Sequence, residues 1–451
     1  MTNQHATNIN AAPTKTFFVD MLTRDIPLEQ AILDLVDNSV DGAKSLQKTG
    51  ERPFDGFEIK IELSKDKFSI IDNCGGFDSA SAAQYAFRFG RPQNFPRASH
   101  SIGQFGVGMK RALFKFGTEF KVRSATKDDA WEILVNVPEW ESIEDDWTFP
   151  WGEFQPDENI SNLKPGTEII VPTLRPEVAW KFSTANFKNS IIALIKSKHR
   201  QFIAAGLTIK VNEHHLDATS LYLLMSQDTS FRPGVDEMTF TEKGLADVHV
   251  RIIVGVGPSA PRDAGWYVVC NGRVVLEADR RTTTGWGLVE EASNRVEIPS
   301  YHNQFARFRG VVTFDSDDSS RVPWNTTKTD VDQDGKVWQQ TFQRMKEMMR
   351  PVISFLNDLD HDIDEHTRDN SPLLQFVAAA AAVKHDAVPL QKTSFTAPTR
   401  GTLAKVVRTI KIQFSRPREQ VDFLMKELNV ASAKAVGEAT FDLIYSRLED
   451  E

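Results

Sequence analysis

Three short stretches of the 451-residue chain combine acidic, amide and glycine residues. The first is Asp34-Leu35-Val36-Asp37-Asn38, in which Asp34 and Asn38 lie four residues apart and so share one face of a helix. The second, Asp72-Asn73-Cys74-Gly75-Gly76-Phe77, follows an apolar run. The third, Gly103-Gln104-Phe105-Gly106-Val107-Gly108-Met109-Lys110, places three glycines before an amphipathic segment. Carboxylates, one amide and a flexible backbone are groups that could bind a metal ion and a phosphate.

The glycine stretch could bind phosphate through its backbone. Glycine permits positive φ and close approach of a ligand, and the apolar run 109–116 predicts a helix with unpaired N–H groups at its start. The N–H groups of residues 104–107 would then be donors. A plain tight turn has the same composition. The stretch is not a P-loop, because no Lys-Ser or Lys-Thr follows its last glycine. It is not a dinucleotide fingerprint either, because residues 97–101 do not form a strand pattern.

The elements around these stretches follow from hydrophobic periodicity. Residues 28–46 carry apolar side chains at helical spacing, and Asp34, Asn38 and Asp41 share a different face of that helix. The triplet Asn271-Gly272-Arg273 interrupts apolar residues as a hairpin turn does. Strands are expected at 57–63, 67–72, 119–123, 131–137, 167–172, 207–211, 248–256, 266–275 and 310–314, and helices at 187–202, 337–356, 417–429 and 432–447.

In this order, the three stretches resemble the nucleotide site of the GHKL ATPases, the group of gyrase B, MutL, the large heat-shock chaperone, sensor histidine kinases and the MORC proteins. The resemblance covers residues 15–175 and continues more loosely to about 340. It implies an α+β protein: a Bergerat-type ATP-binding α/β sandwich, a transducer-like (ribosomal S5-like) α/β domain and a small, mostly helical C-terminal region. We expect a flexible arm at 1–14, the ATP-binding domain at 15–175 with a lid near 78–105, the transducer-like domain at 176–360, a linker at 361–402 and the helical region at 403–451. The acidic run 358–364 fits a solvated linker.

The resemblance also implies ATP and Mg²⁺ as cofactors. Asn38 would bind Mg²⁺ through its amide oxygen, a hard ligand. Asp34 stands where hydrolysing members usually carry Glu as general base, and its carboxylate sits one methylene nearer its backbone. Misplacement on that scale can cost about 100-fold in rate. Asp37 is a weaker candidate base, because helix geometry turns it away from Asn38.

The same resemblance assigns the remaining contacts with ATP. Asp72 would accept a hydrogen bond from the adenine amino group, although a turn cap after a strand has the same sequence, and Thr167 would support adenine through water. Cys74 departs from the family, where Gly is usual. The adenine pocket would be completed by Gly76 and Phe77, and the triphosphate would be wrapped by Gly103, Gln104, Phe105, Gly106, Val107 and Gly108.

Two lysines each have two interpretations. Lys110 could add charge beside the phosphates or could face solvent from its helix. Lys328, within Pro323-Trp324-Asn325-Thr326-Thr327-Lys328-Thr329, fits the place from which transducer domains send a lysine to the γ-phosphate. An exposed loop lysine would have the same sequence. We take Asp34 and Lys328 as the catalytic candidates.

Composition limits the other possibilities. A net charge of −9 argues against a surface that binds nucleic acid throughout, although residues 387–418 hold seven Lys or Arg and no Asp or Glu. That segment could bind phosphates or balance the acidic remainder. No apolar run approaches the roughly 18 residues of a membrane span. Cys74 and Cys270 are far apart and predict neither a disulfide framework nor a metal cluster, so we expect a cytoplasmic protein.

The sequence therefore predicts a Mg-dependent, slow ATPase that closes as a homodimeric, nucleotide-gated clamp on DNA or a protein client, without a membrane partner. Its closest likeness is to the MORC-like or chaperone-like standalone bacterial ATP-binding proteins. Two alternatives stay open. One is a non-hydrolysing scaffold regulated by ATP, and the other is a GHKL-type protein kinase.

Overall fold

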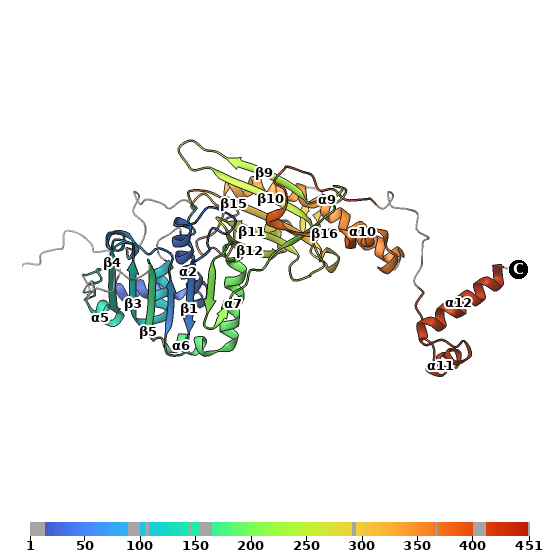
Figure 1. The fold of residues 1–451 in the computed structure, drawn as a ribbon, viewed down its shortest axis with the longest axis horizontal. Coiled ribbons are helices and arrows are strands. Elements are labelled where there is room, and N and C mark those ends of the chain that lie inside the picture. Colours follow the sequence, from blue (N-terminus) through green and yellow to red (C-terminus); the bar gives the residue numbers. More distant parts are fainter. Residues whose placement is uncertain are drawn as a thin grey trace, which may run out of the picture.

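The computed structural model describes residues 14–88, 100–103, 108–143, 146–152, 165–290, 295–366, 368–399 and 412–449. Within them the chain is an α+β protein with two large sheets (Figure 1). Four residues of the expected phosphate loop lie outside the described residues: Gln104, Phe105, Gly106 and Val107. Residues 1–13 of the expected arm and residues 89–99 of the expected lid also lie outside them.

The first sheet has seven strands in the order β4-β3-β5-β2-β1-β6-β7. Alternating burial along β1 shows why its sequence forms a strand with one face in the core. The β1–β2 hairpin pairs Ile59 with Asp72, so the second motif begins where β2 ends. The strands are β1 (Glu58–Leu63), β2 (Phe68–Asp72), β3 (Gly117–Ala125), β4 (Ala130–Asn136), β5 (Gly166–Leu174), β6 (Thr208–Val211) and β7 (His214–His215). The five strands expected between residues 57 and 172 are confirmed.

Helices α2 (Leu28–Ser45) and α4 (Gly108–Phe116) pack against each other beside this sheet. Their apolar side chains, with those of α1 (Lys15–Arg24), join the same hydrophobic core as β1 and β2. Shorter helices are α3 (Ser79–Ser81), continued by a π-helical turn at Ala82–Ala86, and α5 (Val137–Ser142). The packing fixes the first and third motifs close together.

The first sheet does not end at residue 175, where a second domain was expected to begin. Helices α6 (Pro176–Ser183), α7 (Ala185–Lys198) and α8 (Arg200–Ala204) lead to β6, which pairs in parallel with β1 through Ile59 and Ile209. The segment from α6 to α8 connects β5 to β6, two strands of the same sheet, so it belongs with the first sheet.

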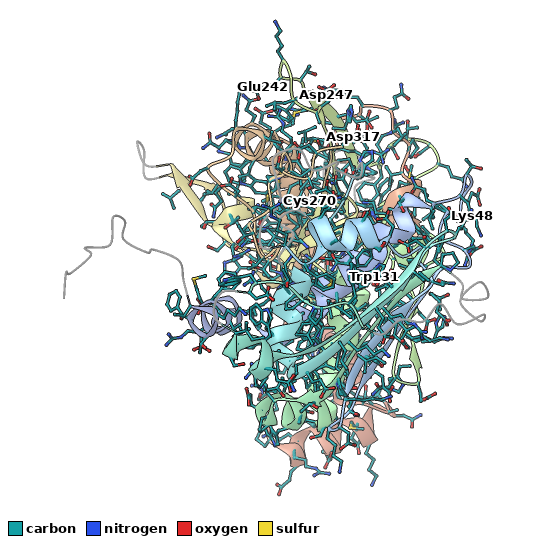
Figure 2. All side chains as sticks on the ribbon, turned by 90° about the vertical axis from the view of Figure 1, so that its left-hand side faces the viewer. Lys48, Trp131, Glu242, Asp247, Cys270 and Asp317 are labelled. Carbon is teal, nitrogen blue, oxygen red and sulfur yellow. The ribbon has the colours of Figure 1, made fainter. Side chains whose placement is uncertain are left out.

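The second sheet has the strand order β12-β11-β15-β10-β9. Asn271 and Gly272, with φ of +48° and +84°, form the expected turn between β11 and β12. In Figure 2, Glu242 and Asp247 mark the loop between β9 and β10, at the edge of the molecule away from Trp131 of β4. The strands are β9 (Gly234–Phe240), β10 (Val248–Val256), β11 (Gly265–Cys270), β12 (Arg273–Asp279) and β15 (Phe308–Asp315). Helix α9 (Lys336–His366) packs on β10 and β15.

Most of the expected linker is ordered structure attached to the second sheet, so that prediction is wrong. Helix α9 runs through the acidic segment, and the buried carboxylate of Asp362 accepts a hydrogen bond from Leu373 N at 3.0 Å. Helix α10 (Pro372–Ala379) leads to β16 (Ala381–Lys384), which pairs with β8 (Tyr222–Met225). A strand whose partner lies about 160 residues away leaves no local signal.

The remaining elements are small. Strands β13 (Leu288–Glu290) and β14 (Arg295–Ile298) form a hairpin, and α11 (Arg418–Glu427) and α12 (Ala433–Glu449) are the two expected C-terminal helices. None of the helices in the described part of the chain combines the length and the apolar character that crossing a membrane requires.

Candidate nucleotide-binding site

Helix α2 carries the first motif, and it buries Asp34 while it exposes Asn38. Asp34 is 9 % exposed, and its Oδ1 accepts a hydrogen bond from Gln30 Nε2 at 3.0 Å. Burial raises the pKa of the Asp34 carboxyl, while the nearby Lys328 ammonium lowers it. Asn38, one turn later, is exposed, and its side chain makes no hydrogen bond to another described residue. Its amide oxygen is therefore available to a hard cation, as the expected magnesium role requires.

Asp72 fills two roles at the end of β2. Its Oδ1 accepts hydrogen bonds from the backbone N–H groups of Cys74 (2.9 Å) and Thr167 (3.2 Å), which makes it a turn cap. Its Oδ2 accepts one from Ser39 Oγ at 2.6 Å. Burial raises the pKa of Asp72, and these hydrogen bonds lower it. A carboxylate has about four acceptor sites, so Oδ2 keeps capacity for the amino group of a base.

The turn after Asp72 requires its glycines. Gly76 has φ of +63°, and a Cβ on it would lie 2.1 Å from the carbonyl oxygen of Ala125. Gly75 also has a positive φ, +98°. Because Gly75 and Gly76 adopt the positive-φ conformations of this turn, position 74 can hold the buried Cys74 side chain in place of the usual glycine. The chain at Gly76 thus touches strand β3 directly.

Phe77 and Thr167 lie beside this turn and meet at one hydroxyl of β3. Phe77 N donates to Ser124 Oγ at 2.9 Å, and Thr167 Oγ1 lies 3.1 Å from the same Ser124 oxygen. The Phe77 ring packs edge-on against Trp131 with centroids 4.8 Å apart. The structure therefore brings the four expected adenine-pocket residues together at the ends of β2, β3 and β5.

Both described ends of the glycine stretch are fixed to α2. Asp41 accepts hydrogen bonds from Ile102 N and Gly103 N, each at 2.7 Å. At the other end, a Cβ on Gly108 would lie 3.0 Å from Asp34 Cβ and 3.1 Å from Asp34 Oδ2. Helix α4 therefore starts against the candidate base, and only a residue without a side chain leaves that carboxylate undisturbed. Asp41 was recognised as sharing the polar face of α2, but not as the anchor of the loop.

Lys110 matches neither of its two expected interpretations. It is 1 % exposed, and its Nζ donates to the carbonyl oxygens of Ala86 (2.8 Å) and Arg88 (2.6 Å). The ammonium thus holds the first, described part of the expected lid. No sequence pattern marks such a contact, because every residue carries a carbonyl group.

Lys328 reaches this site from the loop after β15. It is 6 % exposed, and its Nζ lies 3.6 Å from Asp34 Oδ1 and 2.7 Å from Asp37 Oδ2. The interpretation as an exposed loop lysine is therefore wrong. Asp34 and Lys328, 294 positions apart in the sequence, meet beside the start of α4.

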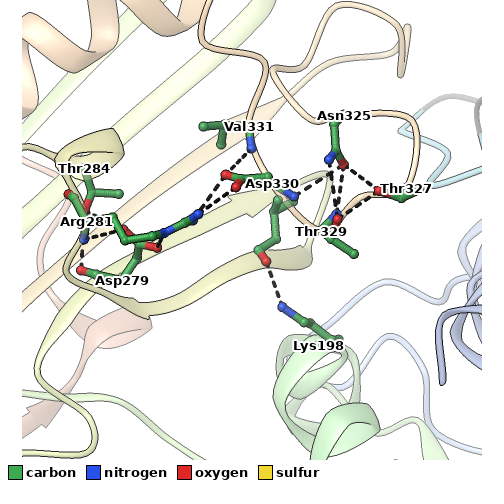
Figure 3. A network of polar contacts seen from close by, with 10 residues as sticks. Lys198, Asp279, Arg281, Thr284, Asn325, Thr327, Thr329, Asp330 and Val331 are labelled. Carbon is green, nitrogen blue, oxygen red and sulfur yellow. Dashed lines mark hydrogen bonds and ion pairs between the residues drawn. The ribbon is translucent and has the colours of Figure 1, made fainter. Parts of the chain in front are cut away.

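The loop that presents Lys328 is braced by its own polar network (Figure 3). Asn325 Oδ1 accepts from Thr329 N at 2.9 Å and from Thr327 Oγ1 at 3.2 Å. Arg281 Nη1 donates to Asp330 at 2.7 Å and its Nε donates to Asp279 at 2.6 Å. This bracing holds Lys328 at φ of +54°, a conformation that a residue with a side chain seldom adopts.

Asp37 forms a buried ionic cluster behind Asp34. Its carboxylate is fully buried and lies 2.9 Å from His199 Nε2, 2.8 Å from Arg273 Nε and 2.7 Å from Lys328 Nζ. Burial alone would raise the pKa of Asp37, but Arg273, Lys328 and His199 together bring it far below its usual range. Asp37 is the weaker of the two candidate bases, and this cluster leaves it no capacity for that role.

The arrangement combines an exposed amide, a buried carboxylate next to a glycine at a helix start, and a lysine from a distant loop. A family model described as "Histidine kinase-, DNA gyrase B-, and HSP90-like ATPase" matches residues 26–167. The chain carries a GHKL-type ATPase domain. The matched range holds α2, the Asp72 turn, the glycine stretch and Thr167, which confirms the resemblance at the level of the GHKL superfamily. No curated protein matches the chain.

Membership of this superfamily supports nucleotide binding, with ATP as the ligand. The residues present fit that ligand, because Asn38 offers an exposed amide, Gly108 leaves room beside Asp34 and Asp72 keeps acceptor capacity. Lys328 lies outside the matched range. Among the described residues, no group of three or more His, Cys, Asp or Glu side chains could hold a metal ion by itself. A cation here would therefore share its ligands with the nucleotide.

Proposed function

We propose that this protein binds Mg-ATP in its GHKL-type domain, hydrolyses it slowly and closes as a homodimeric clamp on DNA or a protein client. The observation that carries the proposal is the meeting of Asp34, the start of α4 and Lys328 one helical turn from Asn38. A base, a phosphate-facing backbone and a cation are the groups that phosphoryl transfer to water requires.

Each side chain then has a separate task. Asn38 holds Mg²⁺, which neutralises charge on the phosphates, and Asp72 selects adenine because its carboxylate accepts from the amino group. Asp34 orients a water molecule and takes its proton. Burial raises the pKa of Asp34, which makes its ionised form a better proton acceptor than an exposed aspartate. Lys328 stabilises charge that develops on the γ-phosphate.

Slow turnover follows from two features of the base. Asp34 is one methylene shorter than the usual Glu, and its Oδ1 lies 3.6 Å from the Lys328 ammonium. Misplacement of a base can cost about 100-fold in rate, and a neighbouring cation lowers its proton affinity. The same contact favours the alternative of a non-hydrolysing scaffold, in which ATP fixes a binding surface.

Phosphate release with Mg-ATP separates the two functions. We expect slow release by the wild type, a loss of about 100-fold or more in Asp34→Asn and a changed rate in Asp34→Glu. The exposed turn residue Asp66, changed to Asn, is the matched control and should leave the rate unaltered. Tight ATP binding without release in the wild type and Asp34→Glu would instead establish the scaffold. Phosphate transfer to an added protein would establish a kinase.

The wider role is part of the same proposal. Closure into a dimer predicts that a non-hydrolysable ATP analogue doubles the mass in solution. Residues 218–399 would act as the transducer-like part, because Lys328 brings their loop to the nucleotide. The likeness to MORC-like or chaperone-like proteins suggests DNA or a protein as client. A cytoplasmic location is supported by Cys74 and Cys270, which are both free thiols.

A further inference from the structure

The buried carboxylate of Asp37 has no task in the proposed chemistry, yet it contacts three segments of the chain that lie outside the matched domain. We propose that Asp37 is a positioning residue: it holds Lys328 beside Asp34 and so couples docking of the second sheet to hydrolysis. This inference rests on the proposed function and names a further residue that the reaction needs.

Both oxygens of Asp37 are occupied by groups from separate elements. Oδ1 lies 2.9 Å from His199 Nε2, between α7 and α8, and accepts from Arg273 Nε, at the start of β12, at 2.8 Å. Oδ2 accepts from Lys328 Nζ at 2.7 Å. All three partners lie beyond residue 167, where the matched domain ends. Asp37 thus joins α2 to three later segments of the chain.

Lys328 is held at both its ends by this cluster. Asp37 fixes the ammonium, and Arg273 Nη1 donates to the backbone carbonyl of Lys328 at 2.8 Å. Arg273 is itself fixed by Asp37, so removal of one carboxylate releases both the tip and the backbone of the lysine. A positive φ at a non-glycine residue persists only where surroundings enforce it, and these two contacts contribute to that enforcement.

The surrounding charges explain why the Lys328 ammonium lies closer to Asp37 than to the candidate base Asp34. Asp34 and Asp37 face two cations, Arg273 and Lys328, and burial lowers the pKa of His199, which keeps it neutral near pH 7. Lys328 Nζ is closer to Asp37 (2.7 Å) than to Asp34 (3.6 Å). Without the Asp37 charge, Asp34 is the nearest remaining counter-ion. Lys328 would then pair fully with the base and lower its proton affinity.

The cluster leaves one buried donor unused. Arg273 Nη2 is buried and has no hydrogen-bond partner in the described part of the chain, and an unpaired buried donor costs free energy. The turn that carries Arg273 also contacts the segment expected to form a lid, since Asn271 Nδ2 donates to Ser101 O at 3.1 Å. The position of this one turn therefore affects both Lys328 and the described end of that segment.

The test compares Asp37→Asn with Asp236→Asn in the full chain. Asp236 is a matched control, because it is also buried (2 % exposed) and also pairs with two cations, Arg344 and Lys392, but lies on β9 of the second sheet. Melting temperature, ATP dissociation constant and single-turnover phosphate release are measured for each. Both variants should melt at a lower temperature. Only Asp37→Asn should lose release by about tenfold or more, with ATP affinity within about twofold of wild type.

Several outcomes overturn the inference. Suppose that the wild type turns over and that Asp37→Asn releases phosphate at the wild-type rate, or loses no more of that rate than Asp236→Asn does. Asp37 is then a structural residue only. Equal losses of affinity and rate show that it contributes to binding rather than to positioning. Absence of turnover in the wild type is a different failure, which removes the proposed function and this inference with it.

A second variant keeps the test valid if Asp37→Asn does not fold. Arg273→Lys retains the positive charge beside Asp37 but cannot also reach the backbone of Lys328 with a second N–H group. It should fold and show the same selective loss of release rate, smaller in size. A folded Arg273→Lys variant with wild-type release would contradict the positioning role.

Discussion

Gly108 offers a test of the site in which activity should fall while stability does not. The Gly108→Ala substitution adds one methyl group at the first residue of α4. That methyl would lie 3.0 Å from Asp34 Cβ, 3.1 Å from its Cγ and 3.1 Å from its Oδ2. Ordinary carbon contacts begin near 3.5 Å, so the Asp34 side chain must move by about 0.4 Å.

The size of the effect follows from that displacement. If a shift of about 1 Å costs about 100-fold in rate, then about 0.4 Å costs roughly sixfold. ATP affinity should change little, because Asn38 and Asp72 are not displaced. Stability should not fall, because alanine is favoured over glycine in a helix by up to about 1 kcal/mol, which offsets the strain of the contact.

The assay pairs phosphate release with thermal melting, and Gly437→Ala is the control. Gly437 lies in helix α12, and a Cβ there meets nothing within 4 Å. Its substitution should stabilise that helix without any change in release. Normal release by Gly108→Ala would refute the placement of α4 against the base. A fall in melting temperature equal to the loss of activity would show that the methyl damages the fold instead.

Three further predictions concern other parts of the site. Gly76→Ala should lower the free energy of unfolding by at least about 3 kcal/mol, measured by denaturant melting, because its methyl would enter a backbone carbonyl at 2.1 Å and φ is positive; a loss below 1 kcal/mol would contradict the turn. Lys110→Met should speed amide hydrogen exchange in residues 82–88 about tenfold, since two carbonyls lose their donor, and unchanged exchange would argue against that anchor. Acidification from pH 7.5 to 5.5 should destabilise the wild type more than His199→Gln, because burial lowers the pKa of His199 in the folded state only. Below about pH 6.5 the unfolded chain gains a proton at His199 that the folded chain does not, which favours unfolding. Equal losses in melting temperature for the two proteins would refute this prediction.

The first sheet and the order of its motifs could be predicted because their signals are local. Strand β1 alternates buried and exposed residues within six positions, and Gly76 and Gly108 mark places where an added side chain would press on a neighbouring residue. The family match at residues 26–167 confirms that reading for the superfamily.

Contacts between distant segments could not be predicted in the same way. The partners of Asp37 lie 162, 236 and 291 positions away in the sequence. No local pattern distinguishes a buried aspartate with several ionic partners from an exposed one. The prediction of a linker was wrong for the same reason, since β16 is a strand only because it pairs with the distant strand β8. Lys110 was misread because its acceptors are backbone carbonyls, which leave no trace in composition.

The most direct test of the central claim is a calorimetric titration of ATP into the wild type and Asn38→Ala, each with and without Mg²⁺. The exposed Asn38 amide is the proposed protein ligand of the metal, and the change leaves the core of α2 intact. We predict that Mg²⁺ strengthens ATP binding to the wild type by at least about tenfold and leaves binding to Asn38→Ala nearly unaltered. Equal magnesium dependence in both proteins, or no ATP binding by the wild type, would contradict the assignment of this site.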